Sequence, residues 1–161
     1  MKKIALAMFA CLALAPAWDQ PARAQADPPK AWQDVRALVV RFNDAQNSHD
    51  LDVIGALLLD SPAFTWADGP VTLQGHDAAV SRLAAMYQSG SWSVLPDYGS
   101  LNIRLVGPDE ADVTLPAQFK EDIPNQDTFV TSSVVYERAV RTPEGWRLSS
   151  VTMQPPLTGS L

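Results

Sequence analysis

Residues 128–154 near the end of the chain, "TFVTSSVVYERAVRTPEGWRLSSVTMQ", indicate the fold more clearly than any other segment. Valine, threonine and aromatic residues dominate it, and such residues favour strands. The segment Thr142-Pro143-Glu144-Gly145 interrupts the pattern with residues typical of a tight turn. We therefore predict two long strands, over 128–140 and 146–154, joined by that turn.

Three segments before this one also have strand character, namely 91–95, 101–106 and 112–120. Pro116 lies within the last of them and indicates an edge position or a bulge there, because proline has no amide hydrogen to donate. The first half differs. Apolar residues recur at helical spacing between Pro29 and Asn47, again over 51–58, and again over 76–88, and two short strands flank Asp68-Gly69-Pro70. Helices followed by a run of strands predict an α+β domain, in which three N-terminal helices pack on a curved, largely antiparallel sheet.

The N-terminus has the order of a secretory signal. Lys2 and Lys3 precede an apolar run that is too short to span a bilayer, and small residues follow it. Cleavage is expected after Ala24 or Ala26, and we favour Ala26. The expectation is thus a signal peptide over 1–26, a single domain over 27–161, and a periplasmic or secreted location. The alternative is an uncleaved N-terminal anchor.

Charge and cysteine content exclude several classes of function. The 161-residue chain has a net charge of −6, so nucleic acid and anionic membranes are poor partners, and no stable membrane anchor is expected after cleavage. The one cysteine, Cys11, lies within the expected signal peptide. The remaining domain therefore has neither a disulfide framework nor a thiol nucleophile.

Three segments resemble the NTF2-like superfamily, also called SnoaL-like or cone-shaped α+β domains. They are "FNDAQNSHDLDVIGALLLDSPAFTWADG" (42–69), "LQGHDAAVSRL" (73–83) and "VVYERAVRTPEGWRLSSV" (134–151). The resemblance covers about Trp32 to Gln154. The resemblance implies a cone-shaped domain whose interior holds a ligand or a catalytic site. The superfamily includes isomerases, cyclases, dehydratases and noncatalytic binding or dimerising domains, so the resemblance leaves each of these functions open.

The same resemblance argues against isomerase chemistry. Aligned through Asp50-Leu51-Asp52, the isomerase tyrosine falls on Phe42 and its general-base aspartate on Trp66, and neither side chain can perform the corresponding proton transfer or hydrogen bonding. The second isomerase acid falls near Ser132 or Ser133. Many family members have histidines in the last strand, where this sequence has Ser150 and Thr152.

A ligand-binding cavity is predicted from these positions and from strand alternation, which would place Trp146, Leu148, Ser150 and Thr152 on one face. The weak catalytic candidate is Asp68, whose Asp-Gly dipeptide is also typical of a turn. Tyr136 and Arg138 share a face with Ser132 and either orient a ligand or form cross-strand pairs, and Gln118 with Lys120 face either ligand or solvent. The predicted cavity residues are Phe42, Trp66, Asp68, Ser132, Val134, Tyr136, Ser150 and Thr152.

His49 and His76 are the only histidines, and each precedes an aspartate. A metal-dependent hydrolase would need several further ligands at matched spacing, so a turn at His49 and a helix start at His76 are the favoured interpretations. We expect no metal and no cofactor.

The sequence thus favours a secreted domain that binds a small apolar or amphipathic ligand in its cone, without isomerase-type catalysis. Two alternatives stay open. One is a cofactor-independent cyclase, dehydratase or isomerase-like enzyme that uses an acid such as Asp68. The other is a dimerisation or interaction module, with a homodimer as its product.

Overall fold

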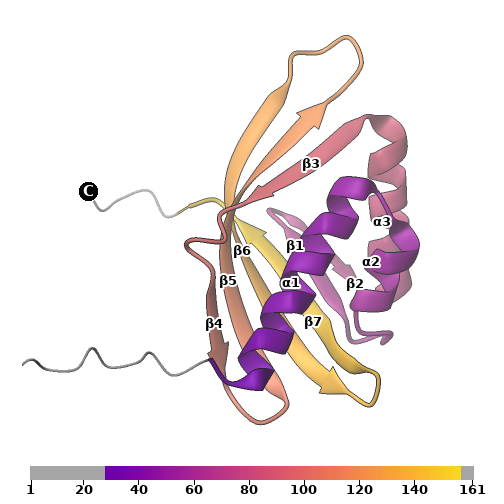
Figure 1. Cartoon of the computed structure of the whole chain (residues 1–161). Coiled ribbons are helices and arrows are strands. Elements are labelled where there is room, and N and C mark those ends of the chain that lie inside the picture. The colour runs from indigo at the N-terminus through magenta and orange to yellow at the C-terminus, as the bar shows by residue number, and fades with distance from the viewer. Residues whose placement is uncertain (1–27, 157–161) are drawn as a thin grey trace, which may run out of the picture.

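The computed structural model describes residues 28–156, in which three helices lie on one side of a seven-stranded sheet that curves around them (Figure 1). The expected signal peptide and the last five residues lie outside the described part. The helices are α1 (Lys30–Ser48), α2 (Leu51–Leu57) and α3 (His76–Ser89). The strands are β1 (Thr65–Asp68), β2 (Val71–Gln74), β3 (Ser91–Pro96), β4 (Asn102–Leu105), β5 (Glu110–Asp122), β6 (Phe129–Thr142) and β7 (Gly145–Gln154).

The strands form one open, mixed sheet in the order β2-β1-β7-β6-β5-β3, and β4 pairs with the other half of the β5 edge. Only the β1–β7 pair is parallel among the described strands. The predicted α+β architecture and its largely antiparallel sheet are therefore confirmed. Within residues 28–156, no helix is both long and apolar enough to cross a membrane.

Local sequence explains how the helices begin. Pro29 immediately precedes α1, where its missing amide costs no hydrogen bond. The Asp50 side chain accepts a hydrogen bond from the Val53 amide and so caps α2. Gly75 precedes α3 with a φ of 95°, a conformation that side chains disfavour.

The core lies between the helices and the inner face of the sheet. Phe42 of α1 is 1% exposed, and Leu115 of β5 and Leu148 of β7 are fully buried beneath the helices. Pro116 lies inside the sheet. The Pro116 carbonyl accepts a hydrogen bond from the Asp97 amide just past the end of β3, and the pairing with β4 begins at Thr114, two residues before Pro116. The missing amide thus falls in the gap between β3 and β4, which is why proline is tolerated at an interior position.

A β-bulge at Ser149 reverses the faces of β7. Arg138 of β6 pairs with Ser150, but the next residue, Ala139, pairs with Leu148, so Ser149 is extra. Trp146 and Leu148 point toward the helices before the bulge, and Val151 and Met153 do so after it. The predicted common face of Trp146, Leu148, Ser150 and Thr152 is therefore wrong, because the bulge moves Ser150 and Thr152 to the outer face.

The end of α1 is fastened to β3 by one side chain. The Asn47 amide nitrogen donates to the Val94 carbonyl at 2.9 Å, and the Asn47 oxygen accepts from the Val94 amide at 2.7 Å. We expect Asn47→Ala to lower the free energy of unfolding by about 2 kcal/mol, because two partly buried backbone groups lose their partner. Urea unfolding measures this, with Asn102→Ala on β4 as the control. A loss no larger than that of the control would contradict the fastening role.

Candidate functional site

A cavity of about 220 Å³ opens between α3 and the inner face of the sheet, beside the far end of the β5–β6 hairpin. Residues of α3 and of six strands (β1, β2, β3, β5, β6 and β7) line the cavity. The cavity therefore forms only when the sheet curves around α3. Its apolar lining residues are Trp66, Val71, Leu73, Met86, Trp92, Phe119, Phe129 and Met153. We call it the mouth cavity.

Aromatic contacts fix the walls of the mouth cavity. The rings of Trp92 and Phe119 stack with centroids 5.5 Å apart, and the Tyr87 ring contacts Trp92 with a centroid distance of 6.1 Å. Trp66 meets Phe42 edge to face at 6.3 Å. Three of the lining rings, those of Trp66, Trp92 and Phe119, are thus held by neighbouring rings and present preformed apolar surface.

Five polar side chains interrupt this apolar lining. Asp68 lies at the end of β1, Arg82 on α3 and Glu121 on β5, while Thr131 and Ser133 add hydroxyl groups from the inner face of β6. Among the described residues, none of the three charged groups forms an ion pair or a hydrogen bond through its side chain. These charges are therefore available to a ligand.

The structure brings together only two of the eight predicted cavity residues. Trp66 and Asp68 line the mouth cavity, and Phe42 lies behind Trp66 in the core, 1% exposed. The others lie on the outer face of the sheet, because the inner face of β6 carries Thr131, Ser133, Val135, Glu137 and Ala139. The outer residues are Ser132, Val134, Tyr136, Ser150 and Thr152.

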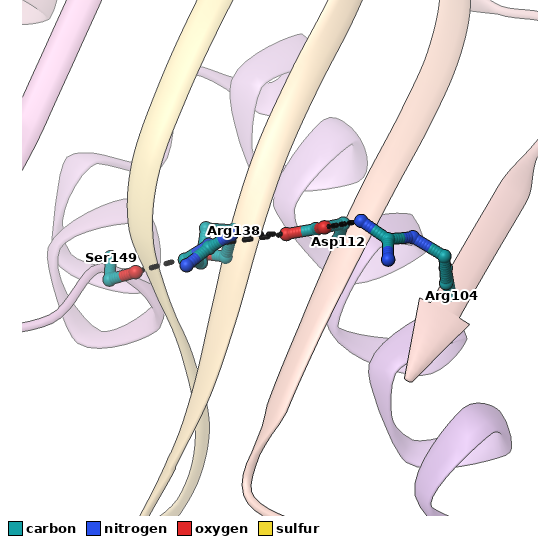
Figure 2. A network of polar contacts seen from close by, with 4 residues as sticks. All are labelled: Arg104, Asp112, Arg138 and Ser149. Atoms are coloured by element: carbon teal, nitrogen blue, oxygen red, sulfur yellow. Dashed lines mark hydrogen bonds and ion pairs between the residues drawn. The ribbon is translucent and has the colours of Figure 1, made fainter. Parts of the chain in front are cut away.

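The outer face carries a polar network that crosses four strands (Figure 2). Asp112 of β5 accepts hydrogen bonds from Arg104 of β4 and from Arg138 of β6, the latter at 2.8 Å, and Ser149 of the bulge donates to the Arg138 carbonyl. Arg138 thus forms a cross-strand pair, one of its two predicted roles. A shallow groove beside the network includes Tyr136 and Ser150, so these two predicted residues meet on the outer face and not in the cone.

Sequence reasoning missed a buried acid, Glu137. It points toward the helices from β6 between Val113 and Val151, is 4% exposed, and its Oε2 atom has no hydrogen-bond partner in the described structure. Burial raises the pKa of Glu137 to about 8. A signal was present, because strict alternation places Glu137 between Val135 and Ala139 on an otherwise apolar face. Glu137 does not line the mouth cavity.

The two histidines hold elements together. His49 ends α1 in a left-handed conformation, stacks on Tyr87 and hydrogen bonds to the Trp92 carbonyl through Nε2. His76 begins α3 and contacts the Asp77 carboxylate through Nδ1 and the Gly55 carbonyl through Nε2. The turn and helix-start interpretations are confirmed. Within residues 28–156, no three His, Cys, Asp or Glu side chains form a group that could hold a metal ion.

His76 should make stability depend on pH. Burial lowers the pKa of His76, but the hydrogen bonds to Asp77 and Gly55 and nearby negative charge outweigh burial, so the net pKa is above the usual 6.5. The folded state then holds the proton more tightly. The resulting stabilisation is complete below pH 6.5 and is lost as the pH rises through the folded-state pKa. We expect His76→Gln to cost more stability at pH 5.5 than at pH 8.5, measured by urea unfolding. An equal cost at both pH values would contradict this.

Comparison with known proteins supports the fold and leaves the activity open. No protein-family model matches the sequence, and a search of curated proteins finds no match. Solved structures do match. An NTF2-like superfamily protein from Salmonella enterica superposes with a TM-score of 0.73 at 18% identity, covering 81% of this chain and 94% of the other.

Two further structures have names that state an activity. A proposed dehydratase of the NTF2-like family from Streptomyces avermitilis has a TM-score of 0.69 at 20% identity, covering 80% of this chain and 98% of its own. A proposed aromatic ring hydroxylase from Novosphingobium aromaticivorans has a TM-score of 0.71 at 13% identity, covering 83% and 94%. Together with the helix and strand order, these likenesses show that the chain has the NTF2-like fold. At such identities they show nothing about its chemistry.

Proposed function

We propose that this protein binds a small apolar or amphipathic ligand in the mouth cavity and that this binding is its function. The observation that carries the proposal is the cavity itself, because apolar and aromatic walls with a small number of polar groups are the usual form of a small-molecule site. Trp66 occupies the position that the resemblance assigns to the general base of isomerases. Its side chain supplies apolar cavity surface and cannot accept a proton.

One direct test uses indole, a neutral amphipathic probe, and two matched variants. Ser133 points into the mouth cavity, whereas Ser132 is exposed on the outer face of the same strand. We expect indole to raise the melting temperature of the wild type and of Ser132→Phe, because a ligand that binds only the folded state stabilises it. Ser133→Phe fills the cavity and should abolish the shift. Equal shifts in both variants would place the site elsewhere, and no shift in the wild type would contradict the proposal.

Asp68 supports a second candidate, an acid-base enzyme of the dehydratase, cyclase or isomerase-like kind. Its carboxylate lines the mouth cavity, where it could accept a proton from a bound substrate, and one structure of similar fold is a proposed dehydratase. The discriminating experiment requires a turnover assay on a substrate found by screening. Asp68→Asn should abolish turnover while leaving binding in place, and unchanged turnover would remove Asp68 as the base.

Export and self-association are further parts of the proposal. Residues 1–26 have the sequence pattern of a cleaved leader, and N-terminal sequencing of the exported protein should begin at Asp27. A homodimer is proposed through the outer sheet face, where Leu95, Val130 and Tyr136 are more than a third exposed. Light scattering that gives a monomer at all concentrations would contradict it.

A further inference from the structure

The charged groups of the mouth cavity do not balance one another. Asp68 and Glu121 bring two carboxylates and Arg82 brings one guanidinium, and none of them has an ion-pair partner within the described residues. The cavity wall is therefore net negative, as is the chain as a whole at −6. A bound anion would face a two-to-one excess of like charge, whereas a cation would meet a favourable field.

Aromatic rings lie beside both carboxylates in the sheet and add to the field that attracts a cation. Trp92 of β3, Glu121 of β5 and Phe129 of β6 are direct cross-strand neighbours in one row, and all three line the cavity. One carboxylate is thus flanked by an indole and a phenyl ring. Trp66 lines the other side of the cavity, two residues before Asp68 on the same face of β1. Aromatic faces carry negative charge density and attract cations, most strongly where water is partly excluded.

We propose that the ligand of the mouth cavity is a small organic cation, an ammonium group attached to an apolar body. This inference rests on the proposed binding function and adds the charge of the ligand to it. The ammonium group lies between the carboxylates and the ring faces, and the apolar body contacts Met153 and Leu73, the cross-strand neighbours of Asp68 and Trp66. Arg82 limits the cation to a single positive charge, because its own charge opposes a second one.

The test compares three probes of the same shape: benzyltrimethylammonium, the neutral isostere neopentylbenzene, and the anion phenylmethanesulfonate. Binding to the full chain is followed by NMR titration, with the same cosolvent in every sample. We expect the cation to bind roughly tenfold more tightly than the neutral probe, and the anion more weakly than either. Added salt should reduce this preference.

Charge-removing variants connect the preference to the named residues. Asp68→Asn and Glu121→Gln should each weaken cation binding by roughly threefold to tenfold while changing neopentylbenzene binding by less than about twofold. Arg82→Gln should strengthen cation binding. Glu110→Gln removes an exposed carboxylate from the opposite end of β5 and is the matched control, with no expected effect.

The outcomes separate the two proposals. If the neutral probe binds as tightly as the cation, or the anion binds best, the inference about charge is wrong and the binding function stands. If the cation preference survives both Asp68→Asn and Glu121→Gln, the assignment to the mouth cavity is wrong. If none of the three probes binds, the charge inference fails, and the binding function fails with it only if indole also does not bind.

Discussion

Glu137→Gln should remove most of the loss of stability that the wild type shows as the pH rises from 5 to 8. The pKa of Glu137 is raised by burial to about 8, whereas the same carboxyl in the unfolded chain has its ordinary value near 4.5. As the pH rises, the unfolded state therefore ionises first, and the free energy of unfolding falls. The fall over this range is about 3 kcal/mol, since one pKa unit corresponds to 1.36 kcal/mol.

Urea unfolding at several pH values measures this effect as a difference between wild type and variant. The difference is needed because His76 also loses its stabilising proton in this range and lowers stability in both proteins. Glu110→Gln, an exposed acid changed in the same way, should keep the wild-type pH dependence. If Glu137→Gln has the same slope as the wild type, Glu137 is ionised in the folded protein and its placement in the apolar interior is wrong.

Phe42→Ala should lower the free energy of unfolding by about 3–5 kcal/mol, because truncating a fully buried aromatic side chain leaves a cavity that the core fills only partly. Phe42 of α1 is 1% exposed and contacts the Trp66 ring from the core side. Phe129→Ala is the matched control. Phe129 is 63% exposed at the rim of the mouth cavity, so its truncation should cost less than about 1 kcal/mol.

The two variants also separate a core role from a ligand-contact role. If Phe42→Ala lowers the free energy of unfolding no more than Phe129→Ala does, the Phe42 side chain faces open space. The sequence-based prediction of Phe42 as a cavity residue requires that result. If the large cost is found, the residue that replaces the isomerase tyrosine is part of the core and contributes to binding only through Trp66.

Residue patterns predicted the elements of this fold well because each depends on local chemistry. The turn at 142–145 and the proline before α1 each depend on residues that are adjacent in the sequence, and the structure has both. The faces of β7 could not be predicted in the same way. The bulge at Ser149 accompanies long-range pairing, including the hydrogen bond from the Leu59 amide to the Leu148 carbonyl, which alternation along one strand does not reveal.

The candidate site was less predictable for a related reason. The resemblance to isomerases points to Trp66 and, two residues later on the same face of β1, to Asp68. Arg82 and Glu121 join them only after α3 is laid over the curved sheet, and nothing in their local sequence distinguishes them from solvated charges. Alternation along β6 places Glu137 as an acid on an apolar face, opposite the face that carries the predicted residues Tyr136 and Arg138.

The methyl NMR signals of methionine show whether the mouth cavity holds the ligand. The chain has four methionines, and the two within the described residues, Met86 and Met153, both line the cavity from opposite elements. After labelling of the methionine methyl groups, and assignment by Met86→Leu and Met153→Leu, indole is titrated into the full chain. Both signals should shift along one binding curve, because an aromatic ring placed between them alters their shielding. If indole binds and neither signal moves, the ligand site is not the mouth cavity.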